Sequence, residues 1–104
     1  MADVINPGDV VRVSTSPGFK NAAGSLGDPT TVRLVWRRHG DVATTWTFGV
    51  GGQIVKDSVG LYHADIPVVG HGLHYFRWEG VGGGIDAAEE STFSVASNFV
   101  AGMP

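Results

Sequence analysis

Three histidines and one aspartate lie close together in the chain and carry groups that ligate metal ions. His63, Asp65, His71 and His74 offer imidazole and carboxylate ligands of the kind that zinc takes in proteins. Their spacing works against a shared site, because His71 falls in an expected turn while His63 and His74 belong to different expected strands. We therefore predict no bound metal, and a site made by His63, His71 and His74 is the alternative. His74 itself is expected to be partly buried and held by one hydrogen bond.

The patterns that mark a nucleophile, a tuned acid and base, or a phosphate-binding loop are not found. Serine, histidine and aspartate are all present, but no G-x-S-x-G turn exposes a nucleophilic serine. Glu89 and Glu90 have the pattern of solvated charges. The glycine-rich run at 80–84 lacks the Lys-Ser/Thr pair of a phosphate-binding loop, and we predict a mobile strand connection there. These observations predict a protein that is not an enzyme and takes no cofactor.

The aromatic residues allow a binding surface as well as a core. Trp36, Trp46 and Trp78 could together form a platform for a carbohydrate or a peptide. In a stand-alone binding module, Tyr75, Arg77 and loop residues would recognise the ligand. Each tryptophan buries on the order of 150 to 250 Å² when it is packed inside a protein. A small domain needs that burial to offset the entropy of its chain. We predict that the tryptophans line the core.

Composition limits the fold and the partners. The chain has 104 residues, which is enough for one domain covering 1–104 with a single modest core. Its formal net charge of -3 offers no basic face for phosphates, so neither nucleic acid nor an acidic membrane is an expected partner. It contains no cysteine, which excludes disulfides and thiolate metal sites. The first residues do not have the pattern of a signal peptide, and we predict synthesis and folding in the cytoplasm.

The spacing of apolar residues predicts an all-β domain of about seven short strands. Val32, Leu34 and Trp36 alternate with polar residues, which is the period of a strand with one buried face. Sixteen glycines and five prolines are spread between short apolar runs, as in a domain with many turns. The predicted strands cover 10–13, 30–37, 42–48, 54–55, 60–66, 74–79 and a last segment around 93–95. An N-terminal lead at 1–8 precedes them, and 17–29 is expected to be a long loop or a ragged edge segment. The C-terminal arm at 97–104 either docks on another chain or is a frayed end.

Seven strands at this spacing can form a sandwich or a small barrel, and the sandwich is the commoner solution. The stretch at 57–79, in which a Gly/Pro turn joins two strand-like runs, indicates an immunoglobulin-like β-sandwich. We therefore predict a single immunoglobulin-like β-sandwich with extended termini. Phe19 is a large apolar side chain in the long loop, where it can either reach the core or meet a partner.

Three segments of the chain carry a family resemblance. The runs D-S-V-G-L-Y-H-A-D-I and G-L-H-Y-F-R-W-E-G, with D-P-T-T-V-R-L-V-W before them, resemble small immunoglobulin-like proteins encoded in the structural-gene regions of tailed bacteriophages. The likeness covers about 28–95. Two positions depart from the family pattern, since His74 stands where a tryptophan is expected and Gly70-His71-Gly72 replaces a plain P-G turn. The matching residues are Asp28, Pro29, Gly60, Tyr62, Ala64, Ile66, Arg77, Trp78, Glu79 and Gly80.

This resemblance implies a virion structural protein that acts by contact with a repeating lattice and without catalysis. The first expectation is a capsid decoration protein that binds the major capsid protein, is a homo-oligomer on the particle, and is made in the host cytoplasm. A head-tail or tail accessory protein is the next interpretation, and a stand-alone module that binds a peptide or a glycan is the competing one. The residues expected to contact a partner are Ile5, Pro7, Phe19, Leu26, Phe99, Val100 and Met103.

Overall fold

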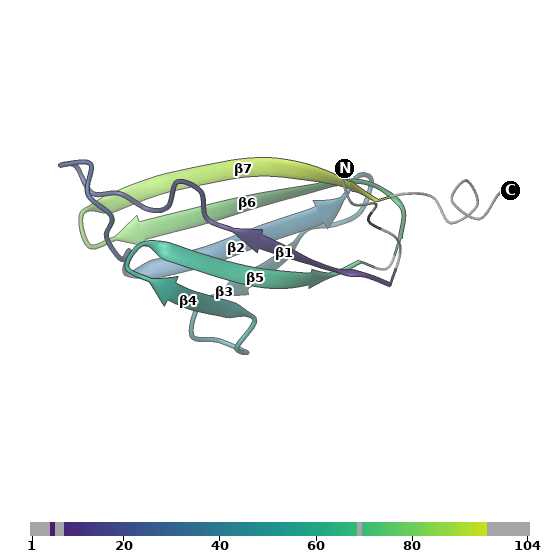
Figure 1. Cartoon of the computed structure of the whole chain (residues 1–104), viewed down its shortest axis with the longest axis horizontal. Helices are drawn as coiled ribbons and strands as arrows, with labels where there is room; N and C mark the ends of the chain where they lie inside the picture. Colours follow the sequence, from purple (N-terminus) through teal and green to yellow (C-terminus); the bar gives the residue numbers. More distant parts are fainter. Residues whose placement is uncertain (1–4, 6–7, 69, 96–104) are drawn as a thin grey trace, which may run out of the picture.

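The computed structural model describes residue 5 and residues 8–68 and 70–95, and this part of the chain contains seven β-strands (Figure 1). The strands form two antiparallel sheets that pack as a sandwich, so the predicted all-β class is confirmed. The strands are β1 (Val10–Ser14), β2 (Thr31–Arg38), β3 (Thr44–Thr47), β4 (Ile54–Ser58), β5 (Leu61–Pro67), β6 (Gly72–Gly82) and β7 (Ile85–Val95).

One sheet has three strands in the order β1-β5-β4, and the other has four in the order β3-β2-β6-β7. In the four-stranded sheet β2 lies between β3 and β6, so the expected β2–β3 hairpin is present. β6 and β7 are the longest strands and pair along their whole length, from Gly72 opposite Val95 to Gly82 opposite Ile85. This long hairpin forms one side of the sandwich.

The core lies between the two sheets and follows the predicted alternation. Val32 and Leu34 of β2 are buried, as are Ala64 and Ile66 of β5, while the residues between them face outward or are only half-buried. Trp78 is fully buried on β6. β2 and β5 thus contribute every second side chain over this stretch to one apolar layer, which is the main source of stability in a domain of this kind.

Three expected element boundaries are wrong. The glycine-rich run is not a mobile loop, because β6 continues to Gly82 and a two-residue turn at Gly83 and Gly84 leads directly into β7. Both turn residues have positive φ, 66° and 80°, as a tight hairpin turn of this length requires. β7 begins at Ile85 and so already includes 87–90, and β3 begins at Thr44 instead of Val42.

Gly80 shows why glycines occur inside a strand here. A Cβ at this position would lie 2.6 Å from the Pro29 ring and 2.8 Å from the ring of Phe19. The Phe19 side chain, which belongs to the long loop, therefore packs directly on the β6 backbone. Phe19 is 0% exposed and makes a T-shaped contact with Tyr62, with ring centroids 5.8 Å apart. Glycine is needed here for close packing.

The long loop between β1 and β2 is attached to the sandwich through Asp28. Its Oδ1 accepts hydrogen bonds from the Gly60 amide at 2.9 Å and from the Tyr62 hydroxyl at 3.0 Å. Its Oδ2 accepts one from Lys56 Nζ at 2.6 Å. The Lys56 bond, followed by that from Gly60, lowers the pKa of the Asp28 carboxyl. Burial, together with the bond to Asp28, raises the pKa of Tyr62 to about 12.

A second acidic residue holds the beginning of this loop against β7. The Glu89 carboxylate accepts hydrogen bonds from the Ser16 amide at 2.9 Å and from the Gly18 amide at 3.3 Å. Glu89 lies opposite Trp78 in the β6–β7 register, so its side chain leaves β7 on the inner face of the sheet. β1 and β7 are edge strands of different sheets. The two bonds therefore join the segment that follows β1 to the other sheet.

Both ends of the described chain leave from the same end of the sandwich. The Gly8 amide donates to the Val68 carbonyl, just after β5, and Val95 lies opposite Gly72 at the start of β6. The tip of the β1–β2 loop is at the opposite end, where the Phe19 amide donates to the Gly60 carbonyl at 2.9 Å.

Candidate functional site

The strongest candidate for a binding surface is the outer face of the four-stranded sheet, which we call the outer face below. It is formed by side chains whose parity is opposite to that of the buried Leu34 and Trp78. Neighbouring strands place these side chains in rows that run across the sheet. The rows that matter are Arg37–Tyr75–Thr92, Val35–Arg77–Glu90 and Arg33–Glu79–Ala88, taken from β2, β6 and β7 in that order.

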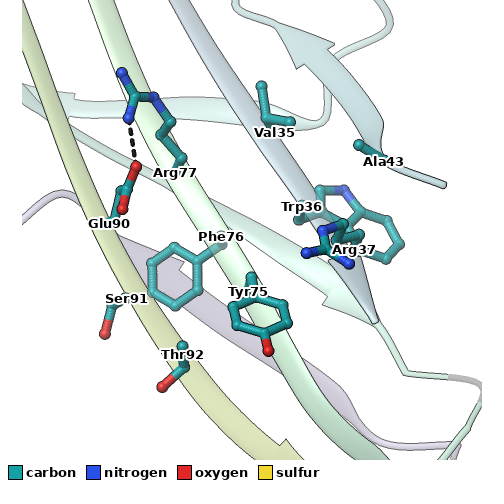
Figure 2. Close-up of a pocket in the computed structure, with 10 residues that line it drawn as sticks. All are labelled: Val35, Trp36, Arg37, Ala43, Tyr75, Phe76, Arg77, Glu90, Ser91 and Thr92. Carbon is teal, nitrogen blue, oxygen red and sulfur yellow. Dashed lines mark hydrogen bonds and ion pairs between the residues drawn. The ribbon is translucent and has the colours of Figure 1, made fainter. Parts of the chain in front are cut away.

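A groove of about 450 Å³ lies on this face (Figure 2). Val35 and Arg37 of β2 border it together with Tyr75 of β6 and Thr92 of β7. Its volume is in the range of small-molecule sites. The lining combines an aliphatic side chain, an aromatic ring, a hydroxyl and a cation, which is a mixture suited to holding an extended segment or a polar ligand.

Arg37 and Tyr75 form a preorganised pair at one end of the groove. The Arg37 guanidinium lies 4.7 Å from the centre of the Tyr75 ring, in cation–π geometry. The Tyr75 hydroxyl also lies 3.1 Å from His39 Nδ1, at hydrogen-bond distance. Stacking occupies the flat face of the guanidinium and leaves its N–H edge available for an acceptor such as a carboxylate.

Arg77, in contrast, is neutralised within the protein. Its Nε donates to Glu79 Oε2 at 2.9 Å, and its Nη1 donates to Glu90 Oε1. The hydrogen bond with Glu90, followed by that with Glu79, raises the pKa of Arg77. Within the described part of the chain, Arg33 and Arg37 form no ion pair with a carboxylate. The positive charge that the outer face can offer to a partner therefore comes from these two arginines.

The histidines lie in separate environments. His63 Nδ1 is 2.7 Å from Asp57 Oδ1 on the outside of the three-stranded sheet. His74 is buried, bonds the Gly72 carbonyl at 3.1 Å and stacks on Phe93 with ring centroids 4.9 Å apart, as expected for a buried histidine with one hydrogen bond. His71 is exposed. Among residue 5 and residues 8–68 and 70–95, no three His, Cys, Asp or Glu residues group in a way that could hold a metal ion.

The prediction that the tryptophans line the core is confirmed for Trp78, while Trp36 and Trp46 are only partly buried. Trp78 is fully buried between the sheets. Trp36 and Trp46 are half-buried and pack against the core, in T-shaped contact with ring centroids 5.3 Å apart. They therefore form no exposed aromatic platform, although Trp36 contributes to the lining of the groove.

The expected contact residues have different outcomes. The expectation that Phe19 contacts a partner is wrong, because its side chain is completely buried and cannot meet a partner while the loop keeps this conformation. Leu26 is 41% exposed at the loop end of the sandwich, and Ile5 is half-buried. The remaining candidates lie outside the described residues: Pro7, Phe99, Val100 and Met103.

Sequence reasoning did not find the Arg37–Tyr75 pair. The signal was present, because strand parity alone places Arg37 and Tyr75 on the polar side of their strands. The register that puts Arg37 directly opposite Tyr75 was the missing information. Sequence patterns within one strand do not contain the offset between two strands.

Comparison with family models, with curated proteins and with solved structures gives no match for this chain. The part of the chain that the structure describes has no helix long and apolar enough to cross a membrane.

Proposed function

We propose that this protein is an immunoglobulin-like structural protein of a tailed bacteriophage particle, and most specifically a capsid decoration protein that binds the major capsid protein lattice. The strand order supports the immunoglobulin-like part of the proposal. Strands β1, β5 and β4 correspond to strands B, E and D of that sandwich, and β3, β2, β6 and β7 correspond to C′, C, F and G. The described residues contain no counterpart of strand A.

The observation that carries the proposal is that the residues matching the family pattern hold the fold together. Asp28 joins the long loop to Gly60 and Tyr62 through its carboxylate. Trp78 fills the core, and Gly80 gives Phe19 and the neighbouring loop room to pack. These residues attach the loop and pack the core of the sandwich, as expected of a motif that defines a structural module. In the proposal the protein acts by contact and catalyses no reaction.

The position of the ends suits attachment to a lattice. The described chain enters at Gly8 and leaves at Val95 at the same end of the sandwich, so one neighbour can contact the chain at both places. In this proposal that end binds the shell, where many copies add individually weak contacts. A head-tail or tail accessory role uses the same end on a different surface of the particle.

Immunogold electron microscopy of particles from a phage lysate, with antibody against this domain, tests the proposal. Label spread over the heads supports decoration, and label at one vertex or along the tail supports the accessory role. Particles without label refute the virion role. A chain that ends after Asn98 should keep its fold by circular dichroism and lose binding to purified shells, and unchanged binding would remove the C-terminal arm from the contact.

A second function has one observation in its favour. The groove beside Arg37 and Tyr75 combines a directed cation with an aromatic ring, which is suited to a soluble peptide or glycan that bears a carboxylate. A stand-alone binding module of this kind would bind such a ligand as a monomer. Titration with acidic peptides and with sialylated and neutral glycans, read by NMR shifts of the Tyr75 ring, distinguishes this function. An Arg37→Ala control, which keeps the Tyr75 ring as the reporter and removes the cation, should abolish the response.

A further inference from the structure

The outer face carries basic side chains that take no part in the ion pairs within the described part of the chain. Glu79 serves Arg77, so Arg33, which lies opposite Glu79 in the β2–β6 register, forms no ion pair of its own within the described part of the chain. Arg37 lies over the Tyr75 ring and likewise forms no ion pair with a described carboxylate. The charged side chains of β2, β6 and β7 on this face are three basic and three acidic, namely Arg33, Arg37, Arg77, Glu79, Asp86 and Glu90.

We propose that the outer face is a homodimer interface in which a second copy packs face to face across a twofold axis. The axis runs parallel to the strands and lies between β2 and β6. This operation places β2 of one copy over β6 of the other, and β3 over β7. The register then determines which residues meet, since the rows stay aligned when the axis is parallel to the strands.

The face is complementary to itself under this operation. Arg33 of each copy falls on Glu79 of the other, which supplies two equivalent ion pairs for charges that lack one in the single copy. Arg37 falls on Tyr75 of the second copy, so that each guanidinium lies between aromatic rings. Both kinds of contact are common at protein interfaces, where arginine and tyrosine are enriched.

Like charges are not opposed in this arrangement. Arg77 falls on Val35 of the second copy, and Glu90 falls on Thr45. The chain has a formal net charge of -3, which makes copies repel one another in general. The outer face escapes this repulsion because its three basic and three acidic side chains cancel. An acidic peptide bound at Arg37 would bring further negative charge to a face that already carries as many carboxylates as basic groups. A second copy brings a face with no net charge, and so it fits better.

Charge-reversal variants test the proposal in free solution. Analytical ultracentrifugation of the wild type over a concentration series should show a species of twice the 10.9 kDa chain mass. Arg33→Glu and Glu79→Arg should each weaken dimerisation by roughly tenfold or more, because each puts two like-charge pairs into the interface. An equimolar mixture of the two variants should dimerise again. In the mixed dimer the new carboxylate at position 33 meets the new guanidinium at position 79, and the native Arg33 and Glu79 still meet each other.

The mixture separates an interface effect from an effect on the fold, because damage within one chain is not repaired by adding another. Lys20→Glu, in the exposed β1–β2 loop, changes the net charge by the same amount as Arg33→Glu and should leave dimerisation unchanged. A monomeric wild type at all concentrations would overturn the proposal. So would reversal variants that dimerise normally, or a mixture that stays monomeric. The inference shares with the proposed function only the expectation that the protein is a homo-oligomer. The assay contains no phage particle, so the homodimer proposal can fail while the virion role stands, and the reverse.

Discussion

Removal of the Asp28 side chain tests whether one carboxylate holds the long loop to the sandwich. In Asp28→Ala, the Gly60 amide, the Tyr62 hydroxyl and the Lys56 ammonium all lose their acceptor. The loop also carries Phe19, whose burial depends on the loop staying in place. We therefore expect a loss of global stability, in addition to local fraying of the loop.

The size of the effect follows from the three bonds. A hydrogen bond to a charged group contributes about 1.5–3 kcal/mol when it is shielded from water. The Asp28 side chain is 34% exposed, so screening reduces these values, above all for the Lys56 ion pair. We expect Asp28→Ala to lower the free energy of unfolding by about 2–4 kcal/mol. Asp28→Asn keeps an oxygen for Gly60 and Tyr62 and should cost about 1 kcal/mol.

The pH dependence has a definite sign. The pKa of Asp28 is lowered in the folded protein, so its carboxylate stabilises the fold at pH values above the unfolded pKa, which is about 3.9. That contribution disappears as the pH falls through the lower, folded pKa. The stability difference between the wild type and Asp28→Asn should therefore be full at neutral pH and shrink in acid.

Urea unfolding followed by tryptophan fluorescence, to which the buried Trp78 contributes, measures both effects. Asp41→Ala is the matched control, because Asp41 also pairs with one cation, Arg38, but its carboxylate accepts no backbone bond among the described contacts. It should cost less than about 0.5 kcal/mol. An Asp28→Ala protein as stable as the Asp41→Ala control would refute the assignment of Asp28 as the anchor of the loop.

Two further substitutions test close contacts. Gly60→Ala should destabilise the protein by several kcal/mol more than Gly24→Ala, because both glycines have positive φ but only the Gly60 Cβ would approach a backbone oxygen, that of Phe19, at 2.7 Å; equal losses in thermal unfolding would contradict the packing argument. Glu89→Ala should cost about 1–2 kcal/mol and increase amide hydrogen exchange at Gly18, whose bond it removes. Glu90→Ala, the neighbouring control, should leave that exchange rate unchanged.

The core could be predicted from the sequence because burial in a strand repeats at every second residue. Leu34 and Ile66 are inside the sandwich for this reason, and so is Trp78. The end of a strand is less well determined by the same pattern. Val42 has high strand propensity, yet it is 90% exposed and lies outside β3, since none of the described strands pairs with it.

The anchoring and binding residues were harder to predict, because their partners are far apart in the chain. Asp28 bonds to residues that are 28, 32 and 34 positions away. Nothing in a local pattern relates these positions. The glycine run was misread for a related reason: glycine disfavours strands in general, but Gly80 lies in one because Phe19 packs against its backbone.

The separation of the two ends of the sandwich makes this domain a scaffold for peptide display. The described chain enters and leaves at the Gly8 and Val95 end, so a carrier joined directly before Gly8 or after Val95 would crowd that end alone. The far loop tip is held by Asn21 Oδ1, which accepts from the Ala23 amide at 3.0 Å, and a Cβ at Gly24 would meet nothing within 4 Å. An epitope inserted beside Ala22 would point away from the carrier that bears the domain.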